Sequence, residues 1–269
     1  MSARLAAAFS RARREGRAAL VVFAEAGDPD LATTARLLPA LAAAGADVLE
    51  VGVPFSDPVA DGPVIQRASE RALASGTNLS GVLDLVSGAR HGGLEVPLVL
   101  FSYANPILAM GEETLARRGA EAGLDGVLVT DLPPEEGRPF AKELRRAGLA
   151  PVYLLAPTSP DARLRQAASL SRGFVYVVSR AGVTGVRSTL PEDLLGLVER
   201  VRRNVPRLPV AVGFGISTPE QVRVVAGVAD GVVVGSAVVA AMEEARADGR
   251  DPVGAAASLV AGLAAAARR

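Results

Sequence analysis

The sequence predicts a (β/α)8 barrel, and three observations lead to that fold class. The chain has 269 residues, close to the length that such a barrel needs. Hydrophobic residues make up 49% of it, enough to fill a large core. Short apolar runs alternate along it with stretches of helical period. Such alternation indicates parallel strands joined by right-handed crossovers, and eight of these units close into a barrel.

The apolar runs are the predicted strands. Their nearly continuous Val and Leu content is typical of parallel strands buried on both faces. They span Ala19–Ala24, Asp47–Val53, Pro97–Tyr103, Gly126–Asp131, Pro151–Ala156, Phe174–Ser179, Pro209–Gly215 and Gly231–Ala237. A doubly wound open sheet is the main alternative. It lacks support because no G-x-G-x-x-G sequence follows the first run.

Helices are predicted between the strands, with an extra one ahead of the first strand. The clearest are Leu5–Arg14, Glu135–Ala147, Pro191–Asn204 and Gly254–Ala267. Glycines placed to end helices precede several strands, namely Gly45, Gly123 and Gly148. Ser, Thr and Pro stand at helix starts, as at 159–161 and 217–220. No linker interrupts the pattern, so residues 1–269 are expected to form one domain.

Composition excludes several classes of protein. Twenty-nine basic and 29 acidic residues give a net charge of zero, which argues against binding to nucleic acid or an anionic membrane. No apolar run is long enough to span a bilayer. The absence of cysteine excludes thiolate chemistry and suits a reducing cytoplasm. Residues 1–17 are rich in Arg, as transit peptides are, but a short helix leading into the first strand is favoured.

The scarcity of Lys and His narrows the chemistry. The one lysine, Lys142, lies in a charged helical stretch and is badly placed for a Schiff base. The one histidine, His91, lies in the predicted loop before the third strand, away from the expected site. Histidine acid–base catalysis and a histidine-bound zinc are therefore excluded. No metal site is predicted, although magnesium on the loop carboxylates remains open. Of the catalytic chemistries considered, proton transfer by carboxylates remains.

Two carboxylates stand where barrel enzymes place their sites, at the carboxyl ends of the strands. Glu50 interrupts an apolar strand, and Asp61 follows in the next loop. Burial should raise the pKa of Glu50 unless an arginine pairs with it. Two carboxyls in different environments can divide the acid and base roles. Asp57, in the same loop, is explained by its Asp-Pro turn.

Glycines after the seventh and eighth predicted strands suggest a phosphate site. Gly215 and Gly235 would let backbone N–H groups approach an anion near a helix N-terminus, and Ser236 adds a hydroxyl. After the sixth strand, residues 179–188 contain two glycines and two arginines, which favours a mobile lid over an anionic ligand.

The sequence resembles the tryptophan synthase alpha subunit family across essentially its whole length. The motifs that carry the resemblance are EVGVPFSDPVADGP at 50–63, SRAGVTG at 179–185, YANP at 103–106, DLP at 131–133 and GFGI at 213–216. The resemblance implies retro-aldol cleavage of indole-3-glycerol phosphate to indole and glyceraldehyde 3-phosphate. It makes Glu50 the general acid–base, and gives Asp61 the task of binding the indole N–H.

The resemblance also implies the rest of the site. Backbone groups of Gly185, Gly215, Gly235 and Ser236 would bind the phosphate, and Thr184 would close the lid by bonding Asp61. The indole pocket would be lined by Phe23, Phe101, Leu128, Leu154, Tyr176, Phe214 and Val233, with the Tyr176 hydroxyl alternatively orienting Glu50. Phe101 and Thr130 stand where smaller or aliphatic residues are common. Glu25 stands where the family often has Thr, so this third acid would either perturb Glu50 or point away.

Family members work as an αββα complex whose beta subunit carries pyridoxal phosphate. The resemblance places beta-subunit contacts at Asp57, Asn105 and Pro133, and Lys142 is badly placed for this chain to anchor the cofactor itself. Three alternatives stay open. They are a stand-alone indole-3-glycerol-phosphate lyase, a non-catalytic barrel that activates a beta subunit, and an unrelated phosphosugar isomerase. The isomerase would need a His or Lys base that the chain does not offer.

Overall fold

A computed structural model describes residues 2–178, 193–213 and 215–268. Within these residues, one parallel sheet contains nine strands. The strands are β1 (Ala19–Glu25), β2 (Val48–Gly52), β3 (Leu98–Ser102), β4 (Gly126–Val129), β5 (Ala150–Val152), β6 (Leu154–Leu155), β7 (Val175–Val178), β8 (Val210–Gly213) and β9 (Gly231–Val234).

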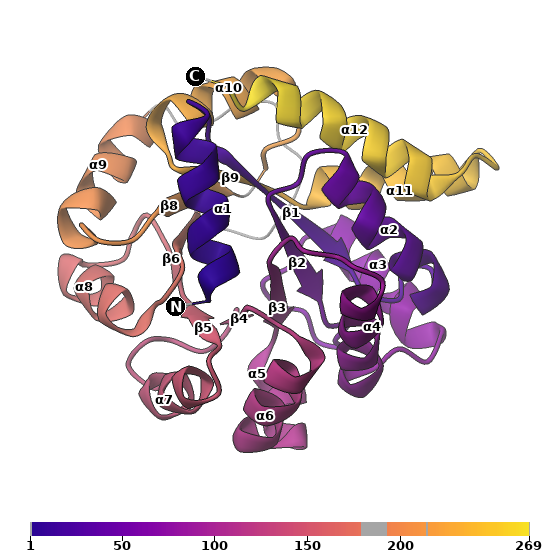
Figure 1. Ribbon diagram of the computed structural model, residues 1–269, viewed down its shortest axis with the longest axis horizontal. Helices are drawn as coiled ribbons and strands as arrows, with labels where there is room; N and C mark the ends of the chain where they lie inside the picture. Colours follow the sequence, from indigo (N-terminus) through magenta and orange to yellow (C-terminus); the bar gives the residue numbers. More distant parts are fainter. Residues whose placement is uncertain (1, 179–192, 214, 269) are drawn as a thin grey trace.

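Twelve helices in the described residues accompany the sheet, most of them in an outer ring (Figure 1). They are α1 (Ala3–Arg14), α2 (Leu31–Ala43), α3 (Pro63–Ala74), α4 (Leu79–His91), α5 (Ala104–Met110), α6 (Glu112–Ala122), α7 (Arg138–Arg146), α8 (Asp161–Leu170), α9 (Leu194–Asn204), α10 (Pro219–Val228), α11 (Ser236–Ala247) and α12 (Pro252–Ala266).

The sheet closes because β5 and β6 are two parts of the fifth predicted strand. Its order is β5-β4-β3-β2-β1-β9-β8-β7-β6, so the two ends of the order are neighbours in the chain. The first part pairs with β4 and the second with β7. The Tyr176 N–H also donates to the Tyr153 carbonyl between the parts, at 3.2 Å. The eight predicted strands and the barrel are therefore confirmed.

Side chains alternate between an inner and an outer core, because successive residues of a strand point to opposite faces. On β1, Val21 and Phe23 belong to the inner cluster, while Leu20 and Val22 pack outward against the helices. On β2, Val48 belongs to the inner cluster and Leu49 and Val51 to the outer one. The same alternation directs Glu50 inward, into the barrel.

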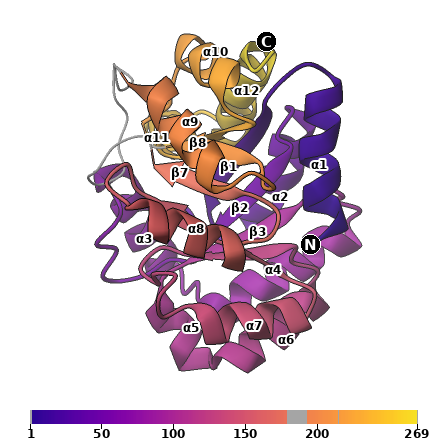
Figure 2. The same ribbon diagram turned by 90° about the vertical axis from the view of Figure 1, so that its left-hand side faces the viewer.

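Helix α1 closes the end of the barrel where the strands begin. It crosses that end inside the ring of outer helices (Figure 1), and the side view places it at the right edge (Figure 2). Its Leu5 and Phe9 belong to the inner core cluster, and the Phe9 ring lies 5.3 Å from that of Phe174. The site must therefore lie at the opposite end.

Three buried or nearly buried aspartates hold this closed end together. Asp47, Asp125 and Asp230 precede β2, β4 and β9. Each donates its N–H to a carbonyl of a neighbouring strand and accepts the N–H of that same residue on its carboxylate. The partners are Leu20, Leu98 and Val210, at 2.8–3.0 Å. Arginines of α1 pair with all three carboxylates, at 3.0 Å for Arg11–Asp47, 3.5 Å for Arg4–Asp125 and 3.6 Å for Arg13–Asp230.

Element boundaries differ slightly from the prediction. Helix α7 starts at Arg138 instead of Glu135, because residues 133–137 form a turn in which the Gly137 N–H donates to the Pro133 carbonyl. His91 is the exposed last residue of α4, not a loop residue. Lys142 is exposed on α7 as expected. No described helix combines the length and apolar composition that a membrane crossing requires.

Candidate active site

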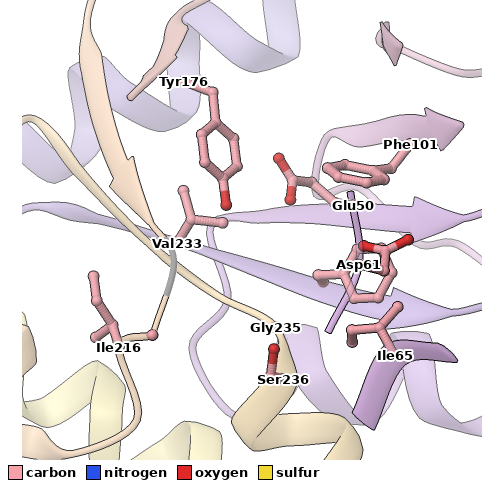
Figure 3. A pocket seen from close by; sticks show the side chains of 11 residues that line it. Glu50, Asp61, Ile65, Phe101, Tyr176, Ile216, Val233, Gly235 and Ser236 are labelled. Atoms are coloured by element: carbon pink, nitrogen blue, oxygen red, sulfur yellow. The ribbon is translucent and has the colours of Figure 1, made fainter. Parts of the chain in front are cut away.

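A cavity of about 490 Å³ opens at the carboxyl ends of the strands. Figure 3 shows two carboxylates and several apolar side chains around it. Its lining combines acids, aromatic rings and glycines: Phe23, Glu50, Asp61, Ile65, Phe101, Tyr176, Gly215, Ile216, Val233, Gly235 and Ser236. A mostly apolar wall with a few polar groups is typical of small-molecule sites.

Glu50 is an acid buried in the barrel, and no cation within the described residues forms an ion pair with it. It is 1% exposed, and its Oε1 atom has no hydrogen-bond partner among the described residues. Burial disfavours the charged form and raises the pKa of Glu50 to about 8. Its carboxyl group lies between the Tyr176 and Phe101 rings (Figure 3). Near neutral pH the group can therefore both give and take a proton.

Asp61 faces the same cavity from the loop before α3. It is 6% exposed, and burial raises its pKa to about 6. The Tyr103 hydroxyl donates to Asp61 Oδ2 at 2.8 Å, which favours the charged form and opposes that rise. The Tyr103 oxygen also accepts the N–H of Ala60 at 3.0 Å. Above pH of about 6, Asp61 is thus a carboxylate fixed by the end of β3.

Aromatic rings form the apolar wall. Phe23 and Phe101 pack edge to face with centroids 5.2 Å apart. Tyr176 is 5% exposed, and burial followed by the nearby charges of Glu50 and Asp61 raises its pKa well above the usual value. Its hydroxyl therefore stays neutral. Any side chain at Gly213 would collide with that hydroxyl, so glycine is needed there.

Glycines that follow β8 and β9 shape the other end of the cavity. Gly215 has φ +82°, in the left-handed region that favours glycine. Gly235 precedes α11 as its N-cap, and Ser236 is the first residue of that helix. The first N–H groups of a helix lack helical partners and attract anions. This end of the cavity is consequently suited to a phosphate.

Some predicted site residues are not cavity walls, and others lie outside the described residues. Leu128 and Leu154 belong to or pack against the inner core cluster and are not in the cavity lining. Thr184, Gly185 and Phe214 fall in the segments that the structure does not describe. The sequence reasoning missed Ile65, Ile216 and Tyr103. The motif YANP could have identified Tyr103, because it places a tyrosine at a strand end.

The third acid, Glu25, lies beside the cavity and does not line it. It is 4% exposed at the end of β1, opposite Gly52 in the strand register. Burial is the main cause that raises its pKa well above the usual value, and the charge of Asp61 adds to it. Burial alone accounts for the raised pKa of Glu50. The described part of the chain contains no group of three or more acids or histidines placed to hold a metal ion.

The segments that follow β2, β3 and β4 contact one another at the cavity mouth. The Phe55 and Tyr103 rings lie 5.2 Å apart, and the Ala104 N–H donates to Asp131 Oδ1 at 2.7 Å. The residues predicted to contact a partner lie here: Asp57 and, at the start of α5, Asn105 are exposed, and Pro133 is half-buried. Two large apolar side chains nearby, Val59 in the first loop and Leu108 on α5, are 76% and 62% exposed.

A comparison with known protein families shows which family the chain belongs to. The family model for the tryptophan synthase alpha chain matches residues 9–268. The chain belongs to the tryptophan synthase alpha chain family. A tryptophan synthase alpha chain of Caulobacter vibrioides is 51% identical over 237 residues, covering 88% of this chain and 86% of that protein. One of Geobacter sulfurreducens is 52% identical and covers 89% and 90%.

Solved structures agree with the tryptophan synthase alpha chain assignment. The alpha subunit from Legionella pneumophila is 38% identical, with a TM-score of 0.91 over 98% of this chain and 97% of that one. A chain of Mycobacterium tuberculosis tryptophan synthase is 37% identical, with a TM-score of 0.90 over the whole of both. The predicted barrel is thus the fold of the tryptophan synthase alpha chains.

Proposed function

We propose that this chain cleaves indole-3-glycerol phosphate to indole and glyceraldehyde 3-phosphate, the lyase step of its family in L-tryptophan biosynthesis. The observation that carries the proposal is the buried Glu50 carboxyl, unpaired on Oε1 within the described chain, which faces a cavity with an apolar wall. The wall suits an indole ring, and the glycine end suits a phosphate.

Glu50 would transfer two protons. Protonation of indole C3 puts positive charge on the ring nitrogen. Removal of the substrate hydroxyl proton then forms the aldehyde, while the electrons of the breaking carbon–carbon bond return to the ring. A carboxyl with a pKa of about 8 is suited to both transfers near neutral pH.

Asp61 would stabilise the charge that develops on the ring. Its carboxylate accepts the indole N–H, and it holds one negative charge close to the nitrogen in a site with little water. Tyr103 fixes the carboxylate with the 2.8 Å hydrogen bond and favours its charged form. The two acids thereby divide the work, as their different pKa values suggest.

The phosphate would bind backbone N–H groups of Gly215, Gly235 and Ser236, at the positive end of the α11 dipole. Gly185 and Thr184 complete the site in this proposal, with Thr184 closing the lid by bonding Asp61. Leu128 and Leu154 would support the indole pocket from the barrel core.

The proposed partner is a beta subunit that carries pyridoxal phosphate, in an αββα complex. The segments with Asp57, Asn105 and Pro133 would face it, because Val59 and Leu108 expose apolar surface there. This chain would need no cofactor of its own. The proposed location is the cytoplasm, in keeping with a biosynthetic role.

The test is an assay of both products, with and without a beta subunit. Slow cleavage that the partner accelerates strongly supports the proposal. Fast cleavage without the partner, and no complex on size exclusion, would favour the stand-alone lyase. Activation of the beta subunit by a chain that produces no indole would favour the non-catalytic barrel and overturn the proposed chemistry.

A further inference from the structure

Glu25 is a buried acid to which the proposed mechanism gives no task. Within the described residues, it accepts a hydrogen bond from Ser69, whose hydroxyl donates to Glu25 Oε1 at 3.3 Å. Ser69 is 3% exposed and belongs to α3. This helix begins two residues after Asp61 and carries the cavity residue Ile65. The contact therefore ties the end of β1 to the helix that follows the Asp61 loop.

The carboxyl of Glu25 lies directly behind the cavity wall. A Cβ atom built on Gly52 would be 2.7 Å from Glu25 Oε2 and 2.6 Å from Phe23 Cζ. The carboxyl and the Phe23 ring thus fill the space over Gly52 together. Phe23 in turn lines the cavity and packs on Phe101. A change in the volume or position of Glu25 would move this wall.

The charged groups that face Glu25 are acids. They are Asp61, from the loop before α3, and Asp28, from the loop after β1. Arg71 of α3 already binds both oxygens of Asp28, at 2.6 and 2.8 Å, and Glu243 of α11 at 2.9 Å. Among the described residues, no cation hydrogen-bonds to Glu25. A carboxylate there would be both desolvated and repelled by Asp61.

We propose that Glu25 is a positioning residue that acts as a neutral acid, holding α3 and the Phe23 wall in place while leaving Asp61 as the charged carboxyl of that side. The inference rests on the proposed function for its effect on catalysis. A neutral Glu25 does not repel Asp61, so Asp61 can ionise for the indole N–H. Its hydrogen bond with Ser69 holds the helix that follows the Asp61 loop.

Three substitutions separate the two parts of this role. Glu25→Gln keeps the length, the neutrality and an acceptor for Ser69. Its kcat should therefore stay within about twofold of the parent value, and the acid limb of the pH profile should stay at the same pH. Glu25→Leu keeps much of the volume and removes the hydrogen bond, and kcat should fall about fivefold with little change in KM, since one hydrogen bond contributes about 1 kcal/mol. Ser69→Ala should give a smaller loss of the same kind.

Two results of these assays would overturn the positioning role. One is full activity in Glu25→Leu. The other is an acid limb that moves to lower pH in Glu25→Gln, because that shift would mean that a charged Glu25 repels Asp61 in the parent. Thermal unfolding of each variant separates a general loss of stability from a loss of kcat in the folded protein.

Infrared spectroscopy tests the protonation state without any substrate. Above the pKa of about 8 for Glu50, the parent should still show the C=O band of a neutral carboxylic acid. Glu25→Gln should lose that band, and Glu50→Gln should keep it. If Glu25→Gln leaves the spectrum unchanged, Glu25 is not a neutral acid in the parent. Because the band does not depend on turnover, the result stands even if the proposed cleavage fails.

Discussion

Two buried carboxyls, one just before strand β2 and one in its middle, have pKa values that shift in opposite directions. Asp47, just before the strand, and Glu50, inside it, are both 1% exposed. Burial would raise the pKa of Asp47, but hydrogen bonds from Arg17, the Leu20 N–H and Arg11 outweigh it, and the net shift is downward. Glu50 has no such donor on Oε1 among the described residues, and burial raises its pKa to about 8.

The same contrast separates the two ends of the barrel. At the closed end, Asp47, Asp125 and Asp230 each pair with arginines and stabilise the docked α1. At the open end, none of Glu25, Glu50 and Asp61 has an ion pair with an arginine or lysine within the described residues. Arginine therefore decides whether a buried acid in this protein stabilises the fold or stays available for proton transfer.

The largest expected effect comes from removing the proton-transfer group at the open end. Glu50→Gln should lower kcat by about 10³-fold and leave substrate binding nearly unchanged, because general acid–base catalysis acts in the transition state. Single-turnover kinetics and equilibrium binding measure the two effects. Retention of more than a tenth of the turnover would contradict the role of Glu50.

The same variant sharpens the stability contrast. A carboxyl whose folded pKa is raised contributes stability below its unfolded pKa, and this stability is lost as pH rises towards the folded value. For Glu50 this window runs from about 4.5 to about 8. The parent should therefore lose more stability than Glu50→Gln between these pH values, which urea unfolding at several pH values would measure.

A charge added at the phosphate end should have the next largest effect. Gly235→Asp should weaken substrate binding by about 100-fold, because its carboxylate would repel the phosphate. Its Cβ would also lie 3.2 Å from Phe23 Cβ. Gly262→Asp is the matched control, since Gly262 is exposed on α12 with no atom within 4 Å of an added Cβ. Equal substrate affinity in both variants would show that the phosphate binds elsewhere.

At the closed end, neutralising an acid should affect stability and leave catalysis unchanged. Asp47→Asn should lower the free energy of unfolding by about 2–3 kcal/mol near neutral pH, because Arg17 and Arg11 lose their charged partner. Asp47 has a lowered pKa, so its contribution is present above the unfolded value of 3.8 and is lost as pH falls through the folded value. The gap between parent and variant should close in acid.

Urea unfolding at neutral and acid pH checks this expectation. Asp248→Asn is the control, because Asp248 pairs with Arg250 at 2.8 Å while 62% exposed, and such surface pairs contribute little. If both variants lose the same free energy of unfolding, the buried ion pair at the closed end stabilises the protein no more than a surface pair does.

The smallest expected effect concerns Tyr103, whose hydroxyl donates a hydrogen bond to Asp61. Tyr103→Phe removes a hydrogen bond that lowers the pKa of Asp61, so this pKa should rise above about 6. The acid limb of kcat/KM should move to higher pH, with a loss of about 3- to 10-fold near neutral pH. Tyr153→Phe is the control, because its hydroxyl bonds the Gly137 carbonyl away from the cavity. If the acid limb stays at the same pH, Tyr103 does not control the pKa of Asp61.

The sequence by itself determined the fold and the principal acids. Eight apolar runs with helical stretches between them predict the barrel, because the period of the side chains follows from local backbone geometry. The interruption of an apolar strand by Glu50 predicts a buried acid. Asp61 and the glycines at 215 and 235 follow from their position after predicted strands. These signals are all local in the chain.

Only the tertiary structure decided which groups surround each acid. Tyr103 reaches Asp61 across 42 residues, and Ser69 reaches Glu25 across 44. The arginines of α1 meet Asp47, Asp125 and Asp230 because the barrel gathers the starts of its strands beneath one helix. A pKa depends on distances of a few ångströms between such groups. Sequence spacing cannot supply those distances, since they exist only once the barrel has closed.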